Sequence, residues 1–119
     1  MANPIRAPFT ATGTVGPWIL DWFQWPFNVS IGVDLSQVTG GCTYGVEYCL
    51  SDIESLVYPP PNGVAVTNPL WRNDPTIGPG STTSGGTGYN FPVQAVRVVV
   101  TAFGSGTGYV EIVQGMNAT

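Results

Sequence analysis

The chain has 119 residues and a formal net charge of −4, which is length enough for one domain with one hydrophobic core. Only 8% of the residues are charged, far below the usual ~25%, and the basic side chains are three arginines, with no Lys and no His. So few basic groups exclude a phosphate-binding patch for nucleic acid and offer no attraction to an anionic membrane surface.

The N-terminal residues lack the apolar core of a signal peptide, and no stretch approaches the roughly 18 apolar residues of a membrane span. We therefore expect the chain to be made and folded in a reducing cytosol, wherever it works later. Cys42 and Cys49 lie seven positions apart in one predicted strand and so on its opposite faces. The prediction is two free, partly buried thiols.

Residues 1–17 contain several Pro and Gly without a sustained pattern and are predicted to form an extended arm, with or without a short strand at its end. Such an arm either drapes over a neighbouring subunit or frays as a free terminus. Residues 18–119 are predicted to form a single β-sandwich domain. Its first strand is expected over residues 18–25, where aromatic and β-branched residues run up to Pro26.

Two alternating segments come next and predict a β-hairpin. Every second residue is apolar over residues 27–36, and the same period returns over residues 42–53, with Cys42 as the first inward residue. Gly40 and Gly41 mark the expected turn between the two strands.

The second half of the chain predicts further short strands between long loops. Two β-branched runs, residues 92–103 and 108–114, flank a Gly-rich tract, which is the pattern of a closing hairpin. No segment carries a helical stripe of ten residues. The predicted fold is therefore all-β, an antiparallel β-sandwich or jelly-roll-like barrel with long loops. Before the hairpin, the sequence predicts a proline-rich excursion at 58–63, short runs at 64–67 and 70–72, and a polar Gly-rich loop at 74–90.

Groups that could carry chemistry are scarce. Asp52 and Glu54 have the spacing of a weak acid pair, but solvated turn carboxylates explain them better than glycoside hydrolysis or Ca²⁺ binding. Residues 104–108 resemble part of a phosphate loop, yet a strand follows where a helix would be needed. No Ser, Thr or Cys has a His or Lys to activate it, and a zinc site lacks ligands. We expect no enzyme activity, no catalytic residue, no cofactor and no metal.

The aromatic residues and one arginine are the candidate site residues. Most of the aromatics occupy alternating strand positions, which favours packing in the core or at a subunit interface over sugar-stacking platforms. The arginine lies on a predicted strand face and needs a carboxylate or several carbonyl groups, either as a structural bracket or in an intersubunit salt bridge. Tyr58, Trp71 and Tyr89 lie next to loops and are expected to be exposed. The candidate interface residues are Trp18, Trp22, Trp25, Tyr58, Trp71, Tyr89 and Arg97.

Three stretches of the chain together resemble a family of small structural proteins of tailed phages. They are residues 26–29 (PFNV), residues 44–52 (YGVEYCLSD), and residues 91–97 (FPVQAVR) with the terminal VQG at 113–115. The similarity covers most of residues 18–115. Cys49 stands where the family usually has Thr, and Ser51 replaces the first acid of its acid pair.

The resemblance implies a virion component with a β-sandwich fold, made in the bacterial host cytoplasm and without catalytic residues. Together with the low charge and the long loops, it leads us to expect a capsid decoration, or cement, protein. Its partners would be the major capsid protein of the phage head and copies of itself, as a homotrimer. The alternative is a tail fibre, spike or adaptor component that binds host glycans.

Overall fold

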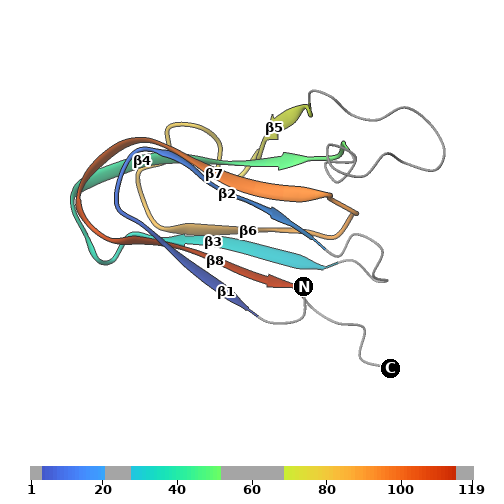
Figure 1. Cartoon of the computed structure of the whole chain (residues 1–119), viewed down its shortest axis with the longest axis horizontal. Helices are drawn as coiled ribbons and strands as arrows, with labels where there is room; N and C mark the ends of the chain where they lie inside the picture. Colours follow the sequence, from blue (N-terminus) through green and yellow to red (C-terminus); the bar gives the residue numbers. More distant parts are fainter. Residues whose placement is uncertain (1–3, 21–27, 52–68, 115–119) are drawn as a thin grey trace.

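The computed structural model describes residues 4–20, 28–51 and 69–114, and these contain strands and loops but no helix. Eight strands form two four-stranded antiparallel sheets, with the orders β1-β8-β3-β6 and β2-β7-β4-β5 (Figure 1). The predicted all-β antiparallel fold is thus confirmed as a β-sandwich-like arrangement. The strands are β1 (Ile5–Phe9), β2 (Gly13–Ile19), β3 (Val29–Asp34), β4 (Val38–Cys49), β5 (Trp71–Asn73), β6 (Gly85–Tyr89), β7 (Ala95–Gly106) and β8 (Gly108–Gln114).

The pairing of the strands is nested along the chain. β1 pairs with β8, β2 with β7, β3 with β6 and β4 with β5, all of them antiparallel. Two more antiparallel pairings, β3 with β8 and β4 with β7, join these couples into the two sheets. The connections β1–β2, β3–β4 and β7–β8 therefore cross between the sheets, and all three turn at the left-hand end in Figure 1.

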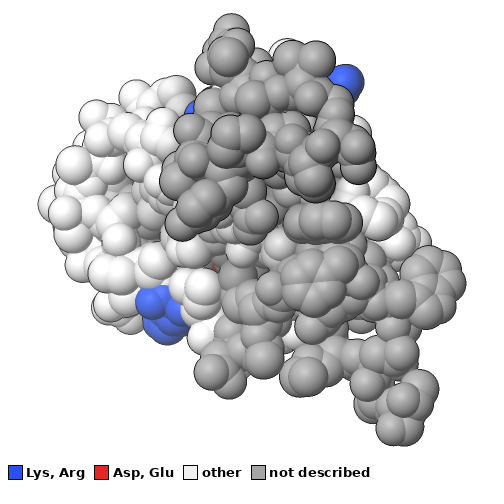
Figure 2. All heavy atoms as spheres, turned by 45° about the vertical axis from the view of Figure 1, so that its right-hand side comes forward, with Lys and Arg blue, Asp and Glu red and all other residues white. Residues whose placement is uncertain are grey.

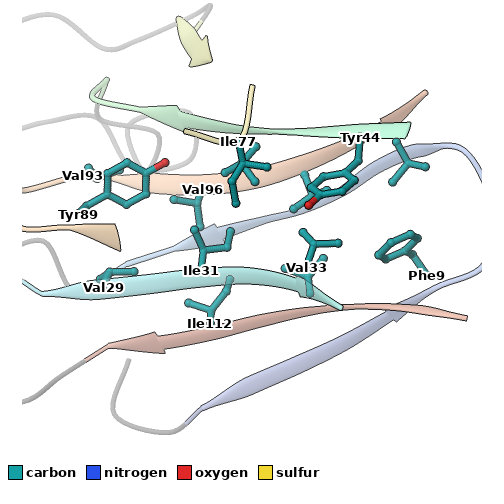
Figure 3. Packing of buried hydrophobic residues seen from close by; sticks show 14 of the residues in the cluster. Phe9, Val29, Ile31, Val33, Tyr44, Ile77, Tyr89, Val93, Val96 and Ile112 are labelled. Carbon is teal, nitrogen blue, oxygen red and sulfur yellow. The ribbon is translucent and has the colours of Figure 1, made fainter. Parts of the chain in front are cut away.

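The hydrophobic core lies between the two sheets (Figure 3). On β3, Val29, Ile31 and Val33 are buried while the residues between them are not, which confirms the period-2 pattern read from the sequence. The facing sheet contributes buried valines of β7 and the buried Tyr44 of β4. Burial of this apolar surface is the main favourable term in the stability of the fold.

The stretch expected to be an extended arm contains two strands, since β1 and β2 lie in residues 4–19. Each strand lies at the edge of its sheet, where a proline that cannot donate to a neighbour is tolerated. Pro8 lies in β1, and Pro17 lies within the irregularity of β2 between Val15 and Trp18. The Pro and Gly that suggested an arm thus mark edge strands.

Both predicted hairpins are wrong. β3 and β4 lie in different sheets, and the turn between them falls at residues 36 and 37, while Gly40 and Gly41 are part of β4. Likewise, β7 and β8 lie in different sheets and are joined through Thr107. Gly106 has φ of +91°, a conformation that glycine adopts without strain and that lets the chain change sheets within one residue.

Three further expectations are resolved by the structure. The loop predicted at 74–90 ends in a strand, β6, whereas the short run at 70–72 corresponds to β5. Within residues 18–25, Trp18 and Ile19 close β2, and residues 21–25 are outside the described part of the chain. The excursion at 58–63 and the run at 64–67 are also outside it. In the part that the structure describes, nothing helical is present that could span a bilayer.

Candidate interaction surface

Four large apolar side chains are exposed at the end of the molecule opposite the short connections. Ile19 closes β2, Leu50 follows β4, Leu70 precedes β5, and Phe91 lies between β6 and β7, with exposed fractions of 46%, 48%, 57% and 46%. The register places Ile19 in one row with Ala95, Cys49 and Trp71, and Leu50 and Leu70 lie one residue beyond this row, next to Cys49 and Trp71. We call Ile19, Leu50, Leu70 and Phe91 the apolar end.

Figure 2 turns this end of the molecule toward the viewer. The described surface visible in this view is mainly uncharged but includes arginine atoms. Large apolar side chains that are exposed at one end of a molecule are typical of a contact surface for another macromolecule.

An aromatic cluster supports the apolar end from the inside. The ring of Tyr48 lies 5.4 Å from that of Tyr89 and 6.2 Å from that of Phe91, and Tyr89 and Phe91 are 5.8 Å apart. The tilted and edge-on arrangements are those that aromatic pairs prefer. Phe91 is therefore held in place although nearly half of its side chain is exposed.

A buried carboxylate holds this cluster to the loop between β5 and β6. Asp74 is only 2% exposed, and its Oδ2 accepts a 2.6 Å hydrogen bond from the Tyr89 hydroxyl. Its Oδ1 accepts hydrogen bonds from the backbone N–H groups of Thr76 and Ile77, each at 2.8 Å. Burial, with the hydrogen bond to Asp74 in addition, raises the pKa of Tyr89 well above its ordinary value. Tyr89 thus stays protonated as a donor, and it ties β6 to the start of the loop.

An ion pair stiffens the outer face of the second sheet beside the apolar end. Arg97 donates to Glu47 Oε1 from both Nε and Nη2, each at 2.7 Å, and the two residues are opposite each other on β7 and β4. The guanidinium also lies 4.1 Å from the ring centroid of Trp71 on β5. Arg97 therefore links three neighbouring strands, through charge-assisted hydrogen bonds and a cation–π contact.

A second arginine cluster lies on the outer face of the other sheet. Arg6 pairs with Glu111 at 3.0 Å and with Asp34 at 3.3 Å, and its guanidinium stacks 3.9 Å from the centroid of the Tyr109 ring. Hydrogen bonds from the side chain and backbone of Ser36, with a smaller contribution from Arg6, lower the pKa of Asp34. These side chains are largely exposed, and exposed pairs of this kind contribute little to stability.

A shallow trough of about 440 Å³ lies next to this second cluster, over β3, β6 and β8. It exists because the outward positions Gly32, Gly86 and Gly88 carry no side chain, and Glu111 and Val113 border it. It offers a flat backbone surface with a single carboxylate, which is already paired with Arg6.

The structure separates the predicted interface residues. Trp71 and Arg97 come together, as described, and of the two kinds of partner expected for Arg97 the structure has a carboxylate, that of Glu47. Trp18 packs partly buried against the core. The prediction that Tyr89 is exposed is wrong, because its side chain is only 3% exposed and its hydroxyl donates to Asp74. Trp22, Trp25 and Tyr58 lie outside the described residues, and the interface role of the whole set stays a prediction.

Sequence reasoning missed the members of the apolar end. Leu50 was assigned to the core by its period, but β4 ends at Cys49, and the side chain beyond it is exposed. Leu70 and Phe91 lie beside predicted loops, and that position was the signal that could have found them, whereas Ile19 lay inside the predicted strand 18–25 and carried no such signal.

The groups with possible chemistry are dispersed. Within the described ranges, no three His, Cys, Asp or Glu side chains lie close enough together to hold a metal ion. Cys42 and Cys49 are both free and buried, as predicted, and burial raises the pKa of the Cys42 thiol. Asp52 and Glu54 are outside the described residues.

Comparison of the chain with models of protein families, with curated proteins and with solved structures finds no match. The resemblance to small phage structural proteins therefore stays a prediction from the sequence.

Proposed function

We propose that this chain is a phage virion structural protein, most specifically a capsid decoration protein that binds the outer surface of the head. The observation that carries the proposal is the apolar end, where four large apolar side chains are roughly half exposed. The proposal assigns the chain no reaction and no cofactor.

The nested strand pairing supports the finer part of the fold prediction, a jelly roll. A jelly roll has eight strands. The first strand pairs with the eighth, the second with the seventh, the third with the sixth and the fourth with the fifth. When this long hairpin is wrapped into two sheets, it contains two Greek keys. The pairs β1–β8, β2–β7, β3–β6 and β4–β5 follow this order. Jelly rolls occur in capsid and lectin domains, so the fold agrees with the proposal without deciding it.

Attachment would use the apolar end. Complete burial of a Leu, Ile or Phe side chain contributes about 1.5–3 kcal/mol, so burial of the exposed half of one contributes roughly 1 kcal/mol. Four such side chains do not make a tight complex alone, because association itself has an entropic cost. On a shell, however, each chain is held among many neighbours, and contacts that exist only in the assembled state stabilise that state.

Cryo-electron microscopy of the virion tests the placement, with density for this chain expected on the outside of the head. Density on the tail would support the alternative of a fibre, spike or adaptor, for which glycan binding near Trp71 is the corresponding assay. Density inside the head would contradict both.

A binding experiment tests the surface itself. Leu70→Asp is expected to weaken cosedimentation with heads that lack the protein by about tenfold or more, because a contact worth roughly 1 kcal/mol is lost and a charge must be desolvated in its place. Val113→Asp is the matched control, since Val113 is also 48% exposed but lies on the outer face of the other sheet. Equal weakening by both variants would remove the apolar end from the proposal.

A further inference from the structure

Each sheet has two edge strands, and three of the four in the described chain carry features that block pairing with another chain. β1 contains Arg6 and Pro8, and β2 contains Pro17 beside an irregularity in its register. β5 has only three residues, one of them Arg72. Charges, prolines, bulges and shortness are the devices by which proteins keep strand edges from pairing with other chains.

The fourth edge strand, β6, has none of these features. Its five residues Gly85–Tyr89 (GGTGY) contain no charge and no proline, and they pair one-to-one with Val29–Val33 of β3 without a register shift. Among the described residues, β3 is its one strand neighbour. An edge strand presents backbone N–H and C=O groups on its outer side, ready to pair with a further strand.

We propose that β6 pairs antiparallel with β6 of a second copy of this chain, about a two-fold axis at Thr87. The sequence of the strand is suited to its own copy. In this register Thr87 faces Thr87, Gly86 faces Gly88, and Gly85 faces Tyr89 of the other copy. Tyr89, the one residue of β6 that is larger than threonine, thus faces a glycine, so no two bulky side chains meet across the seam.

The two faces of the seam support this register. Tyr89 is already packed in its own core with its hydroxyl on Asp74, and Gly85 points to the same inner side, since an added Cβ there would lie 3.6 Å from the Tyr44 hydroxyl. On the outer side, Gly86 and Gly88 form the floor of the trough of about 440 Å³. The paired strands therefore leave no side chain on the outer surface of the seam, and the two sheets become one continuous sheet of eight strands.

Pairing about a two-fold axis makes a dimer, in place of the trimer expected from the sequence. It does not depend on a phage shell, because the contact is between copies of this chain. The purified chain alone tests it, so that its failure leaves the head-binding experiment untouched.

The first test is a charge at the seam. The purified chain is expected to have twice its mass of 12.5 kDa by light scattering, and Gly86→Lys is expected to have the single-chain mass. The lysine fits the fold, because an added Cβ at Gly86 has its nearest contact at 3.6 Å, an ordinary distance. Thr14→Lys, on the exposed edge strand β2, is the matched control and should keep the dimer.

The second test does not depend on the tolerance of a lysine. Directly opposed residues of an antiparallel pair have Cα atoms about 4.5–5.5 Å apart, which a disulfide can bridge. Thr87→Cys should therefore form a covalent dimer under mild oxidation, and Thr14→Cys should not. A single-chain mass for the unmodified protein, an unchanged mass for Gly86→Lys, or no crosslink for Thr87→Cys would each overturn the proposal.

Discussion

Removal of the Asp74 carboxylate is the sharpest test of how the loop before β6 is held. In Asp74→Ala, the N–H groups of Thr76 and Ile77 and the hydroxyl of Tyr89 lose their acceptor together. A buried donor left without a partner costs about 1–3 kcal/mol. Three of them give a loss of about 3–6 kcal/mol, since the loop relaxes to reach water at some of these sites.

Urea denaturation followed by tryptophan fluorescence measures this loss. The midpoint should fall while the slope stays constant, which marks a change of stability without a change of the unfolded state. Asp74→Asn keeps an acceptor oxygen for the two backbone groups and should lose less than half as much.

The matched control is Asp34→Ala, which removes a carboxylate that also accepts a backbone N–H, from Ser36, but at an exposed turn. Its effect should be clearly smaller. If Asp74→Ala and Asp34→Ala lower the midpoint equally, burial of the Asp74 hydrogen bonds is not what holds the loop, and the reasoning fails.

Three other predictions concern the core and its ionisation. The pKa of Tyr89 is raised in the folded protein, so the contribution of the protonated side chain to stability is complete below the unfolded pKa of about 10. This contribution is lost as pH rises above that value, at about 1.4 kcal/mol per pH unit. Tyr89→Phe should therefore show a flatter decline in urea midpoint between about pH 9 and 11, and parallel declines would contradict the assignment. Gly45→Ala should destabilise by about 1–3 kcal/mol, because its Cβ would lie 2.8 Å from the Cα of Pro79; an unchanged thermal midpoint would show that the loop simply moves away. Ile112→Ala should lose about 2–5 kcal/mol in chemical denaturation, whereas Val113→Ala, its exposed neighbour, should stay within about 0.5 kcal/mol; similar losses for the two would mean that burial does not govern stability along β8.

The strands that the sequence predicted well are those with one buried face. β3 alternates without interruption, and Val29, Ile31 and Val33 all reach the core. The period of two is a direct result of the pleat, so it identifies the strand and its inward side from local sequence alone.

The strand partners could not be predicted in the same way. Gly-rich tracts after β3 and β7 suggested hairpins, but both glycine tracts lie within or beside strands that cross to the other sheet. A Gly with positive φ allows a tight turn and a change of sheet equally well. Which of the two occurs depends on distant strands, and these are not visible in the local pattern.

The strand β6 was missed because three of its five residues are glycine, which normally weakens a strand. Here its pairing with β3 outweighs that preference, and Tyr89 fixes its end through Asp74. The same glycines hid the trough, since a surface defined by missing side chains leaves no motif to recognise. Among the interface candidates, the contact of Arg97 with Trp71 likewise required the register of β4, β5 and β7.

The nested pairing has a consequence for biosynthesis. β1 is made first but finds its only described strand neighbour in β8, about one hundred residues later, and β2 must wait for β7. At translation rates of about 5–20 residues per second, synthesis of the residues between them takes about 5 to 20 seconds, and β1 remains without β8 for that time. The prolines and the arginine of these early strands are then present when they are most needed, because they keep the waiting edges from joining strands of other nascent chains.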